Sequence, residues 1–342
     1  MENNKKRSDK HKNKKKNKKP VVISIVVILL LLVSSVFGAG YYYLSKINNS
    51  KISKSNEDLG INNDAQKRID QEDPNKNIVN IALFGVDRRE KNEASRSDSI
   101  MIATIDKNHK KIKLSSVMRD TYVNVPGHGM TKITHAYAYG GAQLAIKTLN
   151  ENFQLNIKDY ATVDFFSLEK IIDSMGGVTI DVKKEEVPLI NQYMAETAGI
   201  EKKAIPTVTK PGTLNLNGMQ AVAYSRIRYV GNGDYERTER QRKVLTALFE
   251  KIQAAGVAKY PSIVSTLLPY TETSISNLDL VSMGTGVLTS GTKTLDQERF
   301  PVDGYCDGKT IGGVYYLVAD LKATTDQMHK YIFDDIKPTA KK

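Results

Sequence analysis

The stretch Ile78-Val-Asn-Ile-Ala-Leu-Phe-Gly-Val86 decides the fold class of this chain. Asn80 is its one polar residue, so the run is apolar at odd and even positions alike. Such a run is typical of a strand that is buried on both faces of a sheet. It is followed at once by charged residues, Asp87-Arg88-Arg89, which mark the end of the strand. We therefore predict a central strand over Ile78–Val86.

Further apolar runs and helical patterns alternate along the rest of the chain. Strands are predicted at Ile100–Ile105, Ile112–Val117, Tyr160–Phe165, Val178–Val182, Arg299–Val302 and Val314–Val318. Helices are predicted at Gly140–Phe153, Ser167–Met175, Asn217–Tyr224, 234–252, Leu278–Leu288 and Lys322–Phe333. Lys183–Lys210 has no periodicity that assigns it. This alternation predicts an α/β fold, an α/β/α sandwich with a central mixed sheet.

A second stretch, Tyr224-Ser-Arg-Ile-Arg-Tyr-Val-Gly-Asn-Gly-Asp-Tyr-Glu-Arg-Thr-Glu-Arg-Gln241, gathers cations near a predicted helix start. If its first part is extended, the side chains of Arg226 and Arg228 leave the same face. The glycines of the Gly-Asn-Gly loop are free to adopt positive φ. A helix then begins near Asp234, a residue type that caps helix N-termini well.

Three side chains fall on one face of the first turns of this helix: Arg237, Arg240 and Gln241. Cations at a helix N-terminus are disfavoured by about 0.3–1 kcal/mol. They are favourable there if an anion binds, because free N–H groups and guanidinium groups both bind phosphate. The alternative is that Glu236 and Glu239 neutralise these arginines on a solvated helix face.

The net charge of +12 is concentrated at the N-terminus. Residues 1–20 carry ten basic and two acidic side chains, so the remaining 322 residues carry only +4. A basic tail of this kind does not predict a nucleic-acid-binding domain, and we expect no nucleic-acid partner. The single cysteine, Cys306, excludes an internal disulfide and a cysteine-based metal cluster.

Residues 21–45 contain no charged side chain, and they are long and apolar enough to span a bilayer. The alternative is a cleaved signal peptide with a small-residue site near Gly38 or Gly40, but the apolar run is long for one. The basic tail, 1–20, is expected to stay in the cytoplasm. We predict a polar extracytoplasmic linker over 46–76 and a catalytic domain over 77–336, held at the cell membrane by one helix.

Carboxylates and arginines follow or precede the ends of the predicted strands. Asp87 follows the first strand and Asp98 precedes the second. If these strands are antiparallel neighbours, both carboxylates lie at one edge of the sheet. Two carboxylates together with phosphate oxygens are a typical way to hold Mg²⁺. The alternative is that each aspartate is an ordinary turn residue.

Other catalytic chemistries have weaker support in the sequence. The five histidines form no H-x-x-x-H or H-E-x-x-H pattern, and the chain has no G-x-S-x-G or Walker sequence. His135 could serve as a base, although a histidine is more often hydrogen-bonded in place.

Six motifs occur in one order along the chain. They are Asn80-Ile-Ala-Leu-Phe-Gly-Val-Asp87, Arg96-Ser-Asp-Ser-Ile-Met101, Arg119-Asp-Thr-Tyr122, Lys132-Ile-Thr-His-Ala-Tyr-Ala-Tyr-Gly-Gly141, Gly176-Gly-Val178 and Tyr224-Ser-Arg-Ile-Arg228 with Asp234–Gln241. Through them, residues 77 to 255 resemble the LytR-CpsA-Psr proteins of Gram-positive bacterial envelopes. Two positions depart from the family pattern, Met118 in place of a proline and Thr134 in place of an asparagine.

The resemblance implies a domain outside the membrane that moves a glycopolymer, such as wall teichoic acid or capsule. The donor would be a polyprenyl-pyrophosphate carrier and the acceptor a sugar hydroxyl of peptidoglycan. It implies Asp87 and Asp98 as ligands of Mg²⁺, and Arg96, Asp98 and Arg119 as the catalytic set. The pyrophosphate would be bound by Arg96, Arg119, Arg226, Arg228, Arg237, Arg240 and Gln241. Lipid tails in this family enter an apolar pocket beneath the sheet, whose lining the sequence does not name.

Alternatives to transfer stay open at the level of sequence. The same site could hydrolyse a lipid pyrophosphate with water as acceptor, or bind the carrier without turnover. A membrane-bound transcriptional attenuator would require the basic tail to bind DNA. The general base is also open, with Asp98, Asp120 and Asp234 as candidates.

Overall fold

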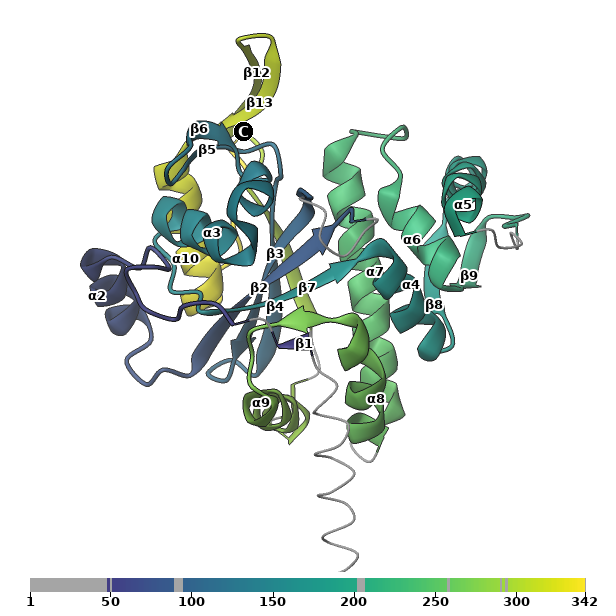
Figure 1. The fold of residues 1–342 in the computed structure, drawn as a ribbon, viewed down its shortest axis with the longest axis horizontal. Coiled ribbons are helices and arrows are strands. Elements are labelled where there is room, and N and C mark those ends of the chain that lie inside the picture. The colour runs from purple at the N-terminus through teal and green to yellow at the C-terminus, as the bar shows by residue number, and fades with distance from the viewer. Residues whose placement is uncertain are drawn as a thin grey trace, which may run out of the picture. The chain divides into compact units, whose positions relative to one another are not determined.

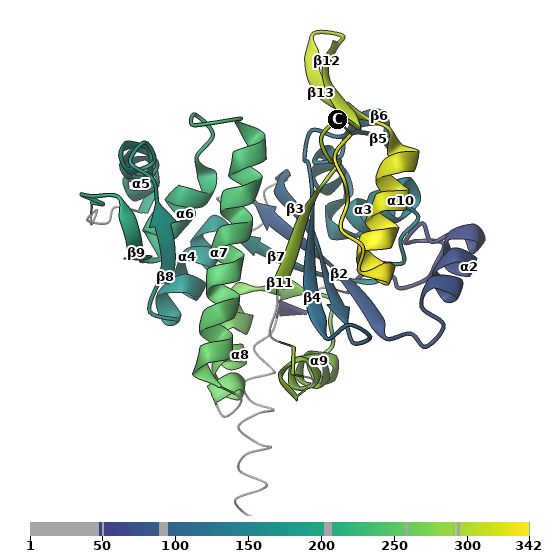
Figure 2. The same ribbon diagram turned by 180° about the vertical axis from the view of Figure 1, so that it is seen from behind.

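The computed structural model of the protein describes residues 48–49, 51–88, 95–201, 207–256, 259–289, 291–292 and 295–341. These residues belong to one compact unit of the chain, 46–342. Figures 1 and 2 show a central sheet with helices on both of its faces. The predicted α/β fold with a central mixed sheet is therefore confirmed.

The central sheet has seven strands among the described residues. Their spatial order is β1 (Asn48–Asn49), β10 (Glu272–Thr273), β7 (Asp159–Asp164), β2 (Ile78–Val86), β3 (Ser97–Asp106), β4 (Lys111–Val117) and β11 (Leu295–Phe300). The pairs β1–β10, β7–β2 and β4–β11 are parallel, and the others are antiparallel. The run that we expected to be buried on both faces is β2, in the middle of this order, and none of its residues is exposed.

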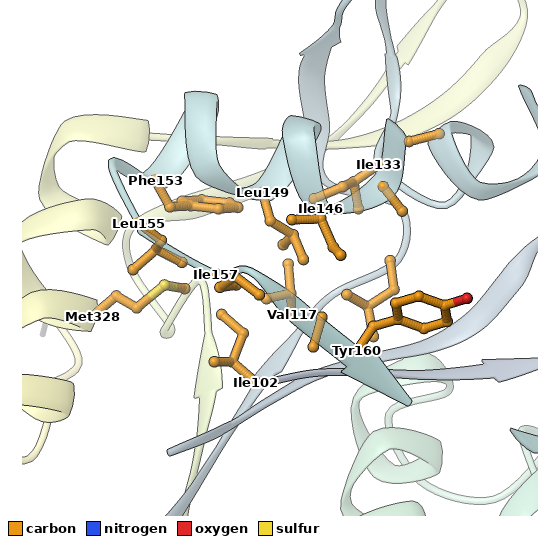
Figure 3. Packing of buried hydrophobic residues seen from close by; sticks show 14 of the residues in the cluster. Ile102, Val117, Ile133, Ile146, Leu149, Phe153, Leu155, Ile157, Tyr160 and Met328 are labelled. Carbon is orange, nitrogen blue, oxygen red and sulfur yellow. The ribbon is translucent and has the colours of Figure 1, made fainter. Parts of the chain in front are cut away.

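One face of the sheet is covered by α3 (His135–Phe153) and α10 (Leu321–Asp334). Figure 3 shows Ile146 and Leu149 of α3 and Met328 of α10 packed toward the strands. All three side chains are fully buried. α3 begins five residues earlier than predicted, and its axis breaks at Gly141, where φ is 61°.

The other face is covered by a second apolar cluster that is built mainly from helices. It comprises α4 (Phe165–Ser174), α5 (Val187–Glu201), α6 (Gly218–Arg226), α7 (Asp234–Ala255) and the antiparallel hairpin of β8 (Val178–Val182) and β9 (Gly212–Leu216). α5 falls in the segment that the sequence left unassigned. Its Ile190 and Met194 are fully buried in the cluster, although their neighbours show no helical periodicity.

The remaining elements are short. They are α2 (Asn63–Glu72), the hairpin of β5 (Tyr122–Val125) and β6 (Gly129–Lys132), α8 (Tyr260–Leu267) with the 3-10 turn Leu268–Tyr270, α9 (Asn277–Thr289), and the hairpin of β12 (Cys306–Ile311) and β13 (Val314–Ala319). The β12–β13 hairpin projects beyond the helices at the top of Figure 1. It is tied to the body where the Leu317 amide donates a hydrogen bond to the Asp120 carbonyl oxygen (2.9 Å).

The predicted polar linker, 46–76, belongs to the fold wherever the structure describes it. Leu59 is fully buried on the α3 face, and its carbonyl oxygen accepts a hydrogen bond from Asn150 Nδ2 (2.8 Å). Farther along, Glu72 of α2 accepts a hydrogen bond from His329 Nδ1 of α10 (2.7 Å). The described part of the predicted linker is therefore packed on the domain. The segment is polar on average, so its sequence does not reveal the few apolar side chains, such as Leu59, that hold it against the domain.

No helix among the described residues is long and apolar enough to cross a membrane. The predicted span, 21–45, and the basic tail, 1–20, lie outside the described residues. Both therefore stay predictions.

A fully buried lysine joins β4 to the C-terminal helix. Lys113 Nζ lies 2.6 Å from Asp106 Oδ2 at the end of β3 and 3.3 Å from Asp335 Oδ1, just after α10. It also donates to the Ile332 carbonyl oxygen (3.1 Å). Since the lysine and Asp106 side chains are both fully buried, the pair has little water to compete with it.

Candidate active site

A polar cavity of about 510 Å³ lies where β2 ends and β3 and α7 begin. Its lining residues are Asp87, Ser95, Arg96, Asp98, Arg119, Phe165, Gln192, Tyr193, Glu196, Arg226, Arg228, Tyr229, Arg237 and Gln241. Five of these are arginines and three are carboxylates, so the wall has an excess of positive charge. Such a wall favours an anionic ligand.

The sheet brings the two predicted carboxylates to this cavity. β2 and β3 are antiparallel, and Val86 pairs with Ser97 at their ends. Asp87 and Asp98 each follow one residue of that pair, so both lie at the same edge of the sheet and line the cavity. The expected geometry is confirmed, and its cause is the antiparallel pairing.

Arg119 contacts three carboxylates at once. It donates a hydrogen bond to Asp98 Oδ1, and its Nε lies 3.4 Å from Asp234 Oδ2 and 3.8 Å from Asp120 Oδ2. Burial acts to lower the pKa of this guanidinium, but the carboxylates, Asp234 first, outweigh burial and raise it. Arg119 is therefore a fixed positive charge in the wall of the cavity.

Two more arginines surround the start of α7. Arg237 is nearly fully buried and donates to Asp234 Oδ2 (2.9 Å) and to the Asp98 carbonyl oxygen (3.1 Å). Burial lowers the pKa of Arg237 to about 10, which still leaves the side chain charged at neutral pH. Arg228 Nε lies 3.7 Å from Asp234 Oδ1. The helix begins at Asp234 as predicted, but Gly233 is its N-cap, so the aspartate orients arginines and does not cap the helix.

Arg226 is held between two aromatic rings. Its guanidinium carbon lies 5.2 Å from the ring centroids of both Phe165 and Tyr193, within range of cation–π attraction. It also donates to Thr197 Oγ1 (3.1 Å). Arg226 is the last residue of α6, where the helix dipole favours a cation. The extended conformation considered for this segment is therefore wrong at Arg226, although Arg226 and Arg228 still line one cavity.

Arg240 does not line the cavity. Its side chain is 3% exposed, and it donates to Glu186 Oε1 (2.7 Å), Glu236 Oε2 (2.9 Å) and the Ile227 carbonyl oxygen (3.2 Å). The contacts with Glu186 and Ile227 join α7 to the turn before α5 and to the loop between α6 and α7. The prediction that Arg240 grips pyrophosphate is corrected to a structural role. Gln241, the next residue, does line the cavity.

The two departures from the family pattern are accommodated without exposed polar groups. Thr134 is buried, and its hydroxyl donates to the Ser97 carbonyl oxygen (2.8 Å) while its amide donates to the Arg119 carbonyl oxygen (3.2 Å). It therefore ties two site segments together. Met118 is buried beside the site. His135, weighed as a base, lies outside the cavity lining with its Nδ1 2.8 Å from Thr131 Oγ1.

A second, apolar pocket of about 250 Å³ adjoins the polar cavity between the sheet and the helices α4, α6 and α7. Its lining residues are Leu83, Phe84, Gly85, Ser99, Met101, Ala161, Val163, Asp164, Phe165, Leu168, Ser225, Gln241, Val244 and Leu245. Phe165 and Gln241 line both spaces. The cationic cavity and the apolar pocket are thus neighbours, and these two side chains belong to the lining of both.

Sequence reasoning missed the α5 side of the cavity. Gln192, Tyr193 and Glu196 come from a segment without periodicity, and Phe165 reads as ordinary core. Phe165 and Tyr193 are visible in the sequence as aromatic residues. Their spacing along the chain does not relate them to Arg226.

The carboxylates that could hold a metal ion are Asp87 and Asp98. The described residues contain no group of three or more histidine, cysteine or acidic side chains placed to hold a metal. Asp98 also contacts Arg119 and Arg228. Two carboxylates fit Mg²⁺ only if substrate oxygens and waters complete its coordination, which is how this ion is commonly held.

The fold and the site define a class: an α/β domain in which a cationic cavity lies beside an apolar pocket, an arrangement suited to an amphiphile with an anionic head. The model of the LytR_cpsA_psr family matches residues 41–331. The chain belongs to this family.

The relatives include two named transferases. The chain is 32% identical over 282 residues to "Polyisoprenyl-teichoic acid--peptidoglycan teichoic acid transferase TagT" of Bacillus subtilis (strain 168), covering 81% of this chain and 83% of that protein. It is 33% identical over 266 residues to the transferase TagU of Oceanobacillus iheyensis, covering 75% of this chain and 76% of the relative.

Solved structures agree with the fold. "TagT bound to LI-WTA" superimposes with a TM-score of 0.61 at 27% identity, covering 77% of this chain and 92% of that one. A structure of YwtF (TagT) "with bound octaprenyl pyrophosphate lipid" gives a TM-score of 0.57 at 25% identity over the same shares.

Proposed function

We propose that the protein is a phosphotransferase that moves a glycopolymer, such as wall teichoic acid or capsule, from polyprenyl pyrophosphate to peptidoglycan. The observation that carries the proposal is that the arginine-lined cavity and the apolar pocket lie side by side, with Phe165 and Gln241 lining both. A polyprenyl pyrophosphate has the two matching parts, an anionic head and an apolar chain. The names of the TagT and TagU relatives support the same substrates and acceptor.

The arginines of the cavity bind and orient the pyrophosphate. Arg119, Arg228 and Arg237 converge on Asp234 and leave guanidinium donors toward the cavity, and Arg226 faces it from the end of α6. Arg96 is exposed at the rim. Because these groups are already positioned by carboxylates and aromatic rings, little reorganisation is needed as negative charge develops.

The transfer proceeds by substitution at the phosphorus that carries the saccharide. A sugar hydroxyl oxygen of the acceptor bonds to this phosphorus. The bond from phosphorus to the bridging oxygen of the pyrophosphate breaks, and polyprenyl phosphate leaves with the bonding electron pair. The hydroxyl proton passes to a carboxylate of the site, for which Asp98, Asp120 and Asp234 are the available groups. Arg119 contacts all three.

Mg²⁺ is the proposed cofactor, with Asp87 and Asp98 as its protein ligands. When bound, it would neutralise phosphate charge beside the arginines. We expect its affinity to be higher in the presence of a pyrophosphate ligand, because two carboxylates alone leave most of its coordination positions unfilled.

We also propose that residues 21–45 anchor the protein in the cell membrane with the basic tail in the cytoplasm and the catalytic domain outside. The support is the length of the apolar run and the charge before it. Protease treatment of intact wall-free cells tests this. Loss of the domain with retention of the tail fits the proposal, and full protection of the domain contradicts it.

The activity test incubates the protein with a polyprenyl-pyrophosphate-linked saccharide, oligomeric peptidoglycan and Mg²⁺, with and without EDTA, and follows products by mass spectrometry. The expected product is a saccharide–phosphate–peptidoglycan adduct that requires the metal. Free saccharide phosphate as the sole product, unaffected by added peptidoglycan, would instead establish a hydrolase. Bound lipid without turnover across several saccharides would leave a carrier-binding protein.

A further inference from the structure

A second polar cavity, of about 330 Å³, adjoins the first beside the start of α7. The residues that line it are Met118, Asp120, Gly231, Asn232, Gly233, Asp234, Tyr235, Tyr315 and Leu317. They come from the end of β4, the loop before α7, the first turn of α7 and the projecting β12–β13 hairpin. The function proposed above does not assign a ligand to this second cavity.

The two cavities have a common wall. Asp120 and Asp234 line the second cavity, and both contact Arg119, which lines the first. One layer of side chains therefore separates a ligand in the second cavity from the arginines that would hold a pyrophosphate. A group that reacts with the phosphate can approach from this side, while the apolar pocket joins the first cavity elsewhere, at Phe165 and Gln241.

The second cavity differs from the first in its charge. Its lining contains two carboxylates and no lysine or arginine, so it does not favour a phosphate. It offers an amide side chain, Asn232, and the main chain of the loop 231–233. Carboxylate, amide and main-chain groups can exchange hydrogen bonds with several hydroxyls of a neutral ligand. The chemistry of the lining thus fits a polyhydroxylated, uncharged group.

Two tyrosine rings add apolar faces to this polar lining. Tyr315 is 49% exposed, and its ring lies 5.9 Å from Lys132 Nζ, which also binds Asp120 Oδ1 (2.8 Å). The ring of Tyr235 is covered on one side by Arg299 at 4.4 Å. Aromatic faces next to hydrogen-bonding groups match a pyranose ring, which has apolar C–H faces and a polar edge. Besides lying near Lys132, the Tyr315 ring packs on Gly308 of β12, and half of the side chain stays exposed.

We propose that this second cavity is the acceptor subsite, where a sugar ring of the peptidoglycan glycan binds between Tyr315 and the loop 231–233. The inference rests on the function proposed above and adds the place of the second substrate. The acceptor hydroxyl then reaches the phosphorus past the rim of the Asp120–Arg119–Asp234 wall, where the two cavities adjoin. Its proton passes to one of the two aspartates as the new phosphorus–oxygen bond forms and polyprenyl phosphate departs.

The experiment compares Tyr315→Ala with Tyr315→Phe and with Tyr139→Ala. Tyr139 is the matched control, because it is also 49% exposed and lies on α3, outside both cavities. With the full-length protein in detergent, NMR titration measures the affinity for a soluble, peptide-free peptidoglycan oligosaccharide without donor. A second titration measures the affinity for the lipid-linked saccharide. A third assay measures the acceptor KM of transfer.

We expect Tyr315→Ala to weaken oligosaccharide binding and raise the acceptor KM by about tenfold, which corresponds to the loss of one good ring contact. Tyr315→Phe should keep most of the affinity, and donor affinity should stay within about twofold. Equal oligosaccharide affinity in wild type and Tyr315→Ala would overturn the proposal. So would a parallel loss of donor affinity, because the cavity would then hold the donor's sugar.

The test separates this inference from the proposed transferase function. If the wild-type protein transfers nothing but binds the oligosaccharide through Tyr315, the subsite stands and the transferase proposal fails. If transfer occurs but the oligosaccharide does not bind at Tyr315, the transferase stands and the subsite is wrong.

Discussion

At the scale of single residues, the site depends on arginines that are held by carboxylates and aromatic rings. Arg119 is the centre of this arrangement, since it contacts Asp98, Asp120 and Asp234 and lies in the wall between two cavities. A side chain with so many fixed partners presents its remaining donors in one orientation. Removal of the Arg119 side chain should therefore slow the reaction by more than the loss of any one of its three ion pairs would.

We predict that Arg119→Ala lowers the rate of transfer by about a hundredfold or more, because one preorganised charge at the reacting phosphate is lost. The fold should remain, since this side chain is about one-fifth exposed. Steady-state kinetics and circular dichroism measure the two effects. The control is Arg68→Ala, an arginine of similar exposure on α2 that pairs with Glu72. Normal polymer attachment by Arg119→Ala would exclude this residue from the site.

A second prediction concerns the ring that packs on Arg226. Tyr193→Ala removes one of its two aromatic partners, and we expect the donor KM to rise by about fivefold to thirtyfold, the factor for an interaction of about 1–2 kcal/mol. Tyr193→Phe should restore the wild-type KM, because the ring and not the hydroxyl contacts the guanidinium. A rise in KM of the same size for both variants would mean that the hydroxyl matters and the ring does not.

The sequence correctly predicted which charged residues gather near the start of α7, but it did not predict which way each side chain points. The sequence placed Arg237, Arg240 and Gln241 on one helix face, and two of them line the cavity. Arg240 is rotated just far enough around α7 to meet Glu186, a carboxylate 54 positions away. Nothing in local spacing reveals such a partner, because Glu186 lies in a segment that the sequence left unassigned, in the turn before α5.

At the scale of elements, the fully buried Lys113 shows how α10 is fixed to the sheet. Its ammonium lies between Asp106 at the end of β3 and Asp335 just after α10. Buried pairs of this kind contribute little net stability compared with an apolar replacement, but loss of one partner is costly. The network therefore ties the C-terminal helix to one position on β4.

This network predicts a pH dependence of stability. Burial would raise the pKa of Asp106, but hydrogen bonds from Lys113 and His109 outweigh burial and lower it below the ordinary value. Its contribution is therefore fully present above about pH 4 and is lost as the pH falls through the folded-state pKa. We expect Asp106→Asn to lower the unfolding free energy by about 3 kcal/mol at pH 7. Urea unfolding at several pH values measures this.

The difference between wild type and Asp106→Asn should shrink below about pH 4, because the wild-type carboxylate is then protonated in the unfolded state and loses its advantage. A difference that stays constant between pH 7 and pH 3 would show that the charge of Asp106 does not contribute. Asp303→Asn, on an exposed carboxylate that bonds Arg299, is the control.

The segment before residue 77 gives a further prediction at this scale. Leu59→Ala should lower the unfolding free energy by about 2–5 kcal/mol, because it empties a fully buried site. Lys51→Ala, on an exposed residue of the same segment, should change it by less than about 0.5 kcal/mol. A chain that begins at residue 77 should be less stable than one that begins at residue 46. Equal urea midpoints for these two chains would contradict the structural role of the segment.

The sequence predicted the strands and helices that have a regular pattern of apolar residues and missed those without one. β2 and β3 were found because apolar runs mark strands that are buried on both faces, and β4 was found from its shorter apolar stretch although it also contains Lys113, Ser115 and Ser116. α5 and α2 were missed because one carries apolar residues around most of its surface and the other is polar on average. Tertiary packing, not local pattern, decides the structure of such segments.

At the scale of the whole molecule, the site lies at an edge of the sheet and between the two apolar clusters. The rule that ligands gather at strand ends predicted the position of the polar cavity from sequence. The resemblance implied an apolar pocket beneath the sheet, but its lining could not be predicted, since it joins residues of β2, β3 and β7 to residues of α4, α6 and α7. Such a surface exists only after the layers have packed.

The helices α7 and α5 contribute differently to the two pockets, and this difference bears on how related proteins can vary. Arg237 and Gln241 of α7 line the polar cavity, and Val244 and Leu245 of the same helix line the apolar pocket. One helix therefore faces the places proposed for both parts of the carrier. Residues of α5 meet only the polar cavity. Substitutions in α5 can therefore change the wall of the polar cavity while the lining of the apolar pocket stays the same. An exchange of this one helix between relatives would vary the surroundings of the anionic head and leave the place of the apolar chain unchanged.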